Sequence, residues 1–139
     1  MKNQIALMDV TCDKYHKLPG GGIEGEEDIH NALIREVQEE SGCLAQVQQE
    51  VGIVIEERLY PGEPTGLFQI SYCFFGKVVQ KGKPSLTKSE KERGFEFIWV
   101  GIQEGIKILE REKPFGYSPR FINKRDLLFL KKGKEMFKN

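Results

Sequence analysis

The segment from Gly20 to Cys43 constrains this chain more than any other part of its sequence. Three consecutive glycines, residues 20–22, precede a run from Asp28 to Ser41 that contains neither glycine nor proline, and Gly42 follows this run. Acidic residues at the start of such a run and a glycine after its end predict a capped helix of about four turns. The glycines allow the backbone before the helix to approach a ligand closely.

Three glutamates near the end of this helix are predicted to share one face. Glu36, Glu39 and Glu40 are spaced i, i+3 and i+4, so their like charges repel by roughly 0.2–0.5 kcal/mol per pair. The helix dipole also disfavours anions in the last turns. Because both effects oppose folding, the arrangement indicates a bound cation, and carboxylate oxygens suit Mg²⁺ or Mn²⁺ held with substrate phosphates. The alternative is a solvated outer face.

The same segment resembles the Nudix box of the Nudix (MutT-like) hydrolase family, G-x5-E-x7-R-E-U-x-E-E-x-G-U, in which U is a bulky aliphatic residue. Cys43 stands in place of the final aliphatic residue, a mild change because a buried free cysteine behaves as a small hydrophobe. The positions in register are Gly21, Glu27, Arg35, Glu36, Val37, Glu39, Glu40 and Gly42.

This resemblance implies an α+β fold, an α/β/α sandwich around a mixed β-sheet, formed by one domain over residues 1–139. It also implies a metal-dependent enzyme in which water cleaves a nucleoside diphosphate linked to another moiety. Arg35 would orient the glutamates and take part in catalysis with them, and Glu27 would support the box. The implied metal ligands are the Gly20 carbonyl, Glu36, Glu39 and Glu40.

Many enzymes of this family recruit a further glutamate from a loop, either as a metal ligand or as the general base. The polar connection over residues 86–94 offers Glu90 and Glu92, and we favour Glu90 as the catalytic carboxylate. Metal ions and a positioned base suit phosphoryl transfer, which is catalysed mainly by positioning and charge neutralisation. The alternative is that both glutamates only solubilise the loop.

Three aromatic residues are candidates for substrate binding, namely Tyr60, Phe68 and Tyr72, although turn or core packing is the alternative for each. The short chain favours clean-up of nucleoside triphosphates or modified nucleotides. An ADP-ribose or dinucleoside polyphosphate hydrolase is the alternative within the family. Outside enzymology, the alternatives are a non-catalytic nucleotide-sensing module and a structural protein that binds metal incidentally.

Periodicity predicts the remaining elements. Strands are expected over residues 4–10, 15–18, 45–58, 67–80 and 95–100, and helices over 102–110 and 119–132. In the last helix, Leu127, Leu128 and Leu130 are expected to face the core. The chain before the glycines is about one strand shorter than the family pattern, so we expect a shortened N-terminal strand and a homodimer rather than a monomer.

Composition excludes several partners. Lys plus Arg equals Asp plus Glu, at 21 each, so no overall basic surface indicates nucleic acid as the main partner. No apolar run is long enough for a membrane segment. The cysteines, Cys12, Cys43 and Cys73, are odd in number and lack metal spacing, which favours a reducing cytoplasm. A nucleotide-type small molecule is therefore the expected partner.

Overall fold

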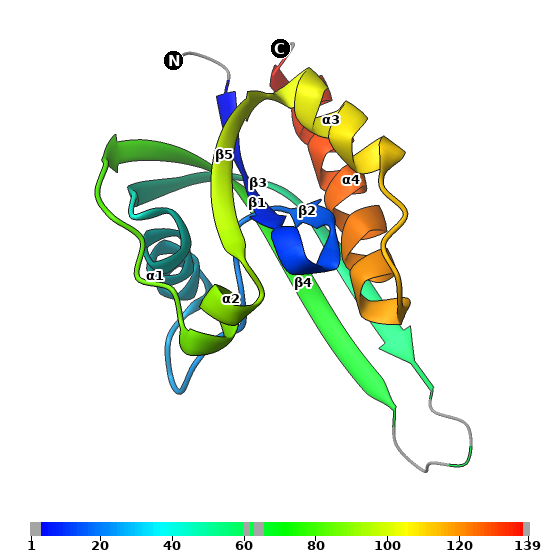
Figure 1. Ribbon diagram of the computed structural model, residues 1–139. Helices are drawn as coiled ribbons and strands as arrows, with labels where there is room; N and C mark the ends of the chain where they lie inside the picture. The colour runs from blue at the N-terminus through cyan, green and yellow to red at the C-terminus, as the bar shows by residue number, and fades with distance from the viewer. Residues whose placement is uncertain (1–3, 60–61, 63–65, 138–139) are drawn as a thin grey trace.

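Two antiparallel β-sheets and the helices around them form the part of the chain that the computed structural model describes, residues 4–59, 62 and 66–137 (Figure 1). The strands are β1 (Gln4–Val10), β2 (Tyr15–Lys17), β3 (Leu44–Arg58), β4 (Leu67–Gln80) and β5 (Phe95–Gly101). The helices are α1 (Ile29–Ser41), α2 (Lys88–Glu92), α3 (Ile102–Arg111) and α4 (Tyr117–Phe137). A single 3₁₀ turn, Thr11–Asp13, joins β1 to β2.

The first sheet has the strand order β2-β1-β5, and the second is the long hairpin β3-β4. Each hydrogen-bonded pair among the described strands is antiparallel. The expectation of one mixed sheet is therefore corrected to two antiparallel sheets. The physical reason is connectivity, because β1 with β2 and β3 with β4 are consecutive strands joined by short segments, and parallel pairing requires a long crossover.

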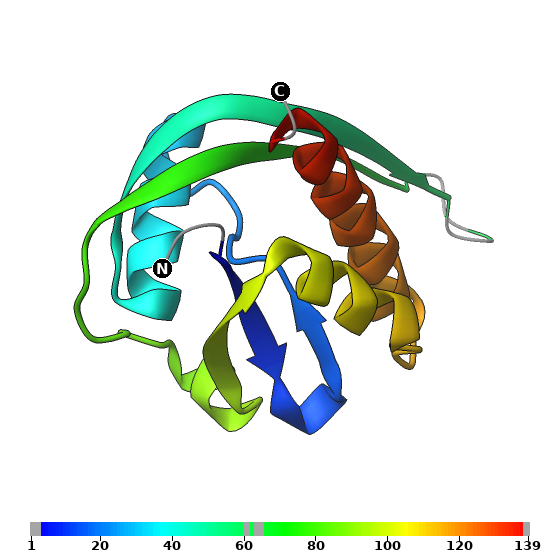
Figure 2. The ribbon, with the colours of Figure 1, turned by 90° about the horizontal axis from the view of Figure 1, so that it is seen from above.

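Helices cover the sheets on both sides, as a sandwich requires. Helix α1 lies on one side and the paired helices α3 and α4 lie on the other, while the β3-β4 hairpin arches over both (Figure 2). One core cluster joins β1, β2 and β5 through buried residues such as Met8 and Phe95. A second cluster joins α3 to α4 through Ile106, Leu109 and Leu130. The predicted α+β sandwich is confirmed.

Helix α1 begins and ends where its sequence predicts. The Asp28 side chain accepts a hydrogen bond of 2.7 Å from the Asn31 N–H, which satisfies one free donor of the first turn. Gly42 closes the helix in the left-handed conformation, with φ of 77°. A Cβ at Gly42 would meet the Gly82 carbonyl oxygen at 2.4 Å, so only glycine fits this cap. Cys43 is buried, as expected for its place in the box.

Three local features differ from the sequence prediction. The connection before β5 contains the short helix α2, which the capping box of Thr87 and Glu90 begins. Helix α4 starts at Tyr117, two residues before Pro119. Leu127 and Leu130 pack in the core, whereas Leu128 is 60% exposed, so its predicted core position is wrong. The three leucines span too wide an arc of the helix to share one face.

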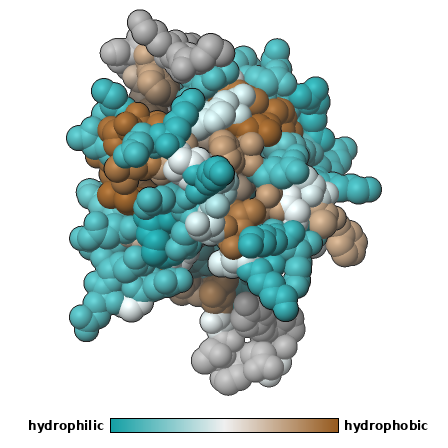
Figure 3. All heavy atoms as spheres, turned by 60° about the vertical axis from the view of Figure 1, so that its left-hand side comes forward, coloured by the Kyte–Doolittle hydropathy of each residue, from teal (hydrophilic) through white to brown (hydrophobic). Residues whose placement is uncertain are grey.

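The surface that carries α1 is mostly hydrophilic, with hydrophobic side chains gathered in separate places (Figure 3). Within residues 4–59, 62 and 66–137, no helix combines the length and the apolar character needed to cross a membrane.

Candidate active site

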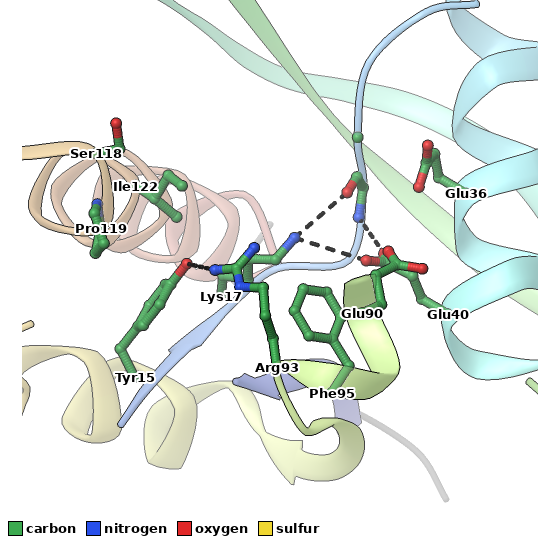
Figure 4. A pocket seen from close by; sticks show the side chains of 12 residues that line it. Tyr15, Lys17, Glu36, Glu40, Glu90, Arg93, Phe95, Ser118, Pro119 and Ile122 are labelled. Atoms are coloured by element: carbon green, nitrogen blue, oxygen red, sulfur yellow. Dashed lines mark hydrogen bonds and ion pairs between the residues drawn. The ribbon is translucent and has the colours of Figure 1, made fainter. Parts of the chain in front are cut away.

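A pocket of about 350 Å³ lies where the glycine turn, α1, α2 and the start of α4 meet (Figure 4). Glu36, Glu40 and Glu90 line one part of it, and Ser118, Pro119 and Ile122 from α4 line another. The glycine turn supplies Gly20 and Gly21 between them. Acidic, backbone and apolar groups from four separate segments thus converge on one cavity.

Three carboxylates form a cluster in this pocket. One oxygen of each of Glu36, Glu40 and Glu90 lies within 4.8 Å of the others. Glu36 and Glu40 are one turn apart on α1, and the capping box of α2 fixes Glu90 opposite them. Burial raises the pKa of Glu36 and raises the pKa of Glu40 to about 7, because the ionised forms lose hydration. Such a cluster is stable when a cation neutralises it.

The Glu40 carboxylate is 1% exposed and only partly satisfied. Its Oε1 accepts a hydrogen bond of 2.8 Å from the Gly20 N–H. Its Oε2 is buried and has no hydrogen-bond partner within the described part of the chain, although the Lys17 ammonium lies 3.7 Å away. A buried acceptor is costly when unsatisfied, so the residues present fit a hard divalent cation.

Arg35 ties the glycine turn to α1. Its guanidinium donates to both oxygens of Glu27, at 2.8 and 3.0 Å, and to the Gly22 carbonyl at 3.0 Å. It also donates to Glu36 Oε1 at 3.0 Å. The hydrogen bonds from Arg35 lower the pKa of Glu27. The predicted orienting role of Arg35 thus has a geometric basis, and Glu27 anchors it through a bidentate pair.

Glu39 lies apart from the other two glutamates of the predicted trio. It is not one of the three clustered carboxylates, and its side chain is 33% exposed beside Arg35, with a shortest separation of 3.4 Å. It lines a second cavity of about 400 Å³ together with Arg35 and residues 80–83. The structure therefore brings Glu36 and Glu40 into the pocket and turns Glu39 toward the neighbouring surface.

The two loop glutamates, Glu90 and Glu92, also lie in different environments. Glu90 lines the pocket, and Glu92 is exposed at the end of α2. The placement is consistent with the preference for Glu90. Glu92 contributes its backbone carbonyl to the Cys12 thiol, at 3.4 Å, instead of a carboxylate to the pocket.

The aromatic substrate candidates do not meet the pocket in the described structure. Tyr60 lies outside the described residues. Phe68 and Tyr72 are 64% and 38% exposed on β4. Successive side chains of a strand point to opposite faces of its sheet. Ser71 contacts Arg125 of α4, so its neighbour Tyr72 points away from α4, and Phe68 shares the face of Tyr72. Neither Phe68 nor Tyr72 is among the residues that line the pocket.

Sequence reasoning missed several pocket residues, among them Tyr15, Lys17 and Arg93. Tyr15 and Lys17 are two residues apart on β2, so they share one face of the strand, and both line the pocket. The two-residue period of a strand could have revealed this relation. Arg93 donates to Asp13 at 3.0 Å and to the Tyr15 hydroxyl at 3.3 Å. The Arg93 contacts join residues about 80 positions apart, so no local pattern announces them. Lys17 and Arg93 give the pocket a cationic side that faces the carboxylates.

The sequence and fold of this chain match those of known proteins. The model of the NUDIX domain family matches residues 2–120. Diphosphoinositol polyphosphate phosphohydrolase 3-alpha from Homo sapiens is 28% identical over 97 residues, which are 70% of this chain and 54% of that protein. The Mus musculus protein of the same name is 29% identical over the same length. The chain therefore spans about half the length of these relatives.

Solved structures share the fold. The Escherichia coli ORF135 protein aligns with a TM-score of 0.57 at 19% identity, covering 98% of this chain and 83% of that chain. The Caenorhabditis elegans Ap4A hydrolase aligns with a TM-score of 0.55 at 13% identity, covering 96% of this chain and 86% of that one. At these identities the likeness concerns the fold alone.

Proposed function

Since this chain belongs to the NUDIX domain family, we propose that its carboxylate pocket binds a divalent cation and hydrolyses a pyrophosphate bond. The observation that carries this proposal is the cluster of Glu36, Glu40 and Glu90, together with the buried Oε2 of Glu40, which has no hydrogen bond within the described residues. Clustered like charges are unfavourable unless a ligand neutralises them. A sensing module without chemistry has no need of such a cluster.

The chain's own residues would hold the ion. Glu36 and Glu40 offer carboxylate oxygens, and the Gly20 carbonyl is a further candidate ligand. Arg35 holds Glu36 through a hydrogen bond of 3.0 Å. When bound, Mg²⁺ or Mn²⁺ would neutralise charge on the phosphate oxygens and lower the pKa of the attacking water. Glu39, at the exposed edge of the site beside Arg35, would be a further ligand of the ion.

Hydrolysis forms a bond from the water oxygen to one phosphorus and breaks the bond from that phosphorus to the bridging oxygen. The bridging oxygen leaves with the other phosphoryl group, and one water proton passes to a base. We propose Glu90 as this base, because it lines the pocket and its helix stands opposite α1. Lys17 and Arg93 supply positive charge for the anionic substrate, since electrostatic stabilisation dominates phosphoryl transfer.

The substrate class that we favour is a nucleoside diphosphate linked to another moiety, with nucleoside triphosphates and modified nucleotides first. The ADP-ribose and dinucleoside polyphosphate classes remain alternatives. The fold neighbours include proteins named Ap4A hydrolase and UDP-X diphosphatase. From the sequence we also propose that the chain folds as one domain, that it is located in the cytoplasm and that it forms a homodimer.

A phosphate-rich substrate without a base is the second candidate. The rings of Tyr15 and Phe95 are 1% and 7% exposed, which leaves little aromatic surface for stacking on a base. Lys17 and Arg93 each lie 5.3 Å from the centre of the Phe95 ring. The names of the curated relatives point to diphosphoinositol polyphosphates, in which phosphate groups dominate.

A substrate panel tests the proposal. Nucleoside triphosphates, oxidised nucleotides, ADP-ribose, dinucleoside polyphosphates and diphosphoinositol polyphosphates would be incubated with Mg²⁺ or Mn²⁺, and phosphorus NMR would score the products. We expect pyrophosphate-bond cleavage of one class, lost on chelation of the ion. Folded protein that cleaves none of them with either ion would contradict the proposal.

Gly21→Ala should disturb the ion site, because a Cβ at Gly21 would meet the Glu36 carboxylate at 2.5 Å. The carboxylate must swing away, and we expect divalent-ion affinity to fall by about 10–100-fold, as for other residues that support metal ligands. Gly22→Ala is the matched control, since a Cβ there meets nothing within 4 Å. Ion titration by calorimetry separates the two, and equal affinities would show that Gly21 does not position Glu36.

Arg35→Lys should lower kcat/KM by about 10–100-fold, the usual effect of losing a residue that orients metal ligands. A lysine cannot reproduce the bidentate pair with Glu27 while also reaching Glu36 and Gly22. Arg111→Lys is the control, because Arg111 is 70% exposed and contacts Glu104 at 3.5 Å and the Lys107 carbonyl at 3.2 Å, both on α3 and away from the pocket. Steady-state kinetics on the cleaved substrate provide the measurement. A rate equal to that of the control would remove Arg35 from the site.

A further inference from the structure

Lys17 places a fixed positive charge among the oxygens of the carboxylate pocket. Its Nζ lies 3.5 Å from the Gly20 carbonyl oxygen and 3.7 Å from Glu40 Oε2. The side chain is 14% exposed, and Figure 4 shows its ammonium pointing between these two oxygens. Glu40 Oε2 is the buried acceptor that has no hydrogen bond in the described chain.

The same carboxylate is the one that a divalent cation in the cluster would use. Glu40 Oε2 belongs to the carboxylate that joins Glu36 and Glu90 in the cluster. An ammonium group and a divalent ion repel each other strongly at a separation of a few ångströms in a partly buried site. The two cations therefore cannot both stay beside Glu40 without a large electrostatic cost.

We propose that Lys17 is an internal cation that neutralises the ionised carboxylate of Glu40 in the ion-free protein and competes with the divalent ion for it. This inference rests on the proposed function, because it needs an ion that binds in the pocket. Binding of the ion then requires the Lys17 ammonium to leave Glu40 Oε2. The face of the Phe95 ring, 5.3 Å from Nζ, offers the ammonium partial compensation.

The proposal explains why a lysine occupies this strand position. An apolar side chain two residues after buried Tyr15 would extend the core contact of β2, but it would leave the buried Glu40 carboxylate without a nearby cation. Lysine places its ammonium 5.3 Å from the centre of the Phe95 ring and 3.7 Å from Glu40 Oε2. Lys17 is thus a positioning residue that acts on the ion through Glu40.

Lys17→Met tests the competition, because methionine keeps much of the apolar stem and removes the charge. Calorimetric titration of MnCl₂ into ion-free protein should show affinity at least about fivefold higher than that of the unaltered chain, the lower range of coupling between two sites. Lys17→Arg keeps the charge and should keep the weaker affinity. Lys107→Met, on the exposed face of α3, makes the same charge change away from the pocket and should leave affinity unchanged.

Thermal unfolding gives a second readout that needs no activity. Without ion, Lys17→Met should unfold at a lower temperature than the unaltered chain, because buried Glu40 has lost its cation. Saturating MnCl₂ should raise the unfolding temperature of Lys17→Met by more than it raises that of the unaltered chain. If Lys17→Met does not fold without ion, Lys17→Gln, whose amide can still donate to Gly20, takes its place in both measurements.

The outcomes distinguish this inference from the function on which it rests. Ion uptake by the unaltered chain with equal or weaker uptake by both neutral variants would overturn the competition and leave the proposed function standing. No uptake by any of these proteins would overturn the proposed function and the competition together. Higher affinity in the neutral variants, with Lys17→Arg unchanged, supports the proposal.

Discussion

Replacement of Glu40 by Gln is expected to lower turnover by roughly 10²–10³-fold, the usual cost of removing one group that stabilises charge in the transition state. The fold should persist, because the Gln carbonyl oxygen can still accept the 2.8 Å hydrogen bond from the Gly20 N–H. The other carboxylate oxygen is replaced by an NH₂ group, so the negative charge and one potential ligand oxygen are lost. Steady-state kinetics with saturating ion measure the effect, and circular dichroism checks the fold.

Glu104→Gln is the control for Glu40→Gln, because Glu104 is 54% exposed on α3 and lies outside the pocket. It makes the same change of charge and should keep the parental rate. Parental turnover in Glu40→Gln itself would show that the assigned carboxylate pocket does not carry the chemistry.

The pH dependence of stability should also change in Glu40→Gln. Burial raises the pKa of Glu40 from 4.5 to about 7, so between these values the folded ion-free protein holds a proton that the unfolded chain has released. The free energy of unfolding therefore falls as pH rises through this interval. Denaturant titrations at several pH values should show a shallower fall in the variant. An unchanged slope would mean that Glu40 does not titrate in this range.

Glu90→Gln is expected to lower turnover by about 10²-fold, the lower range for loss of a general base. Helix α2 should remain, because Gln also completes a capping box with Thr87, whose N–H now donates to Glu90 Oε1 at 2.9 Å. The variant therefore removes the proton acceptor without removing the helix that carries it. Single-turnover kinetics isolate the chemical step.

Glu92→Gln is the matched control for Glu90→Gln. It lies on the same short helix and is exposed, so its turnover should equal that of the unaltered chain. A parental rate in both variants would mean that the base lies elsewhere. A loss confined to Glu92→Gln would reverse the assignment of the loop carboxylate.

The local elements were predictable because short-range rules determine them. Asp28 and Gly42 announce the two ends of α1 through capping chemistry, and both cap the helix as expected. The i, i+4 spacing of Glu36 and Glu40 placed them on one face. Cys43 is buried because the position after the cap returns to the core. The sheet pairing was less predictable, since it depends on contacts between distant segments.

The site was predictable only in part because its geometry depends on long-range contacts. Glu39 shares the helix with Glu40, but Arg35 holds it at the rim, at 3.4 Å, and helical spacing alone does not reveal this. The Arg93 pair with Asp13 spans about 80 residues. His16 likewise meets Glu112 at 2.5 Å across 96 positions, a contact that no local pattern predicts.

Titration of Mn²⁺ into ion-free protein, with the unaltered chain and Glu40→Gln side by side, tests the central claim most directly. We predict saturable uptake by the unaltered chain and uptake at least about tenfold weaker by Glu40→Gln, since the variant lacks the charge of a buried ligand oxygen. Folded protein that takes up no ion, even beside a nucleotide, or equal uptake by both proteins, would contradict the claim.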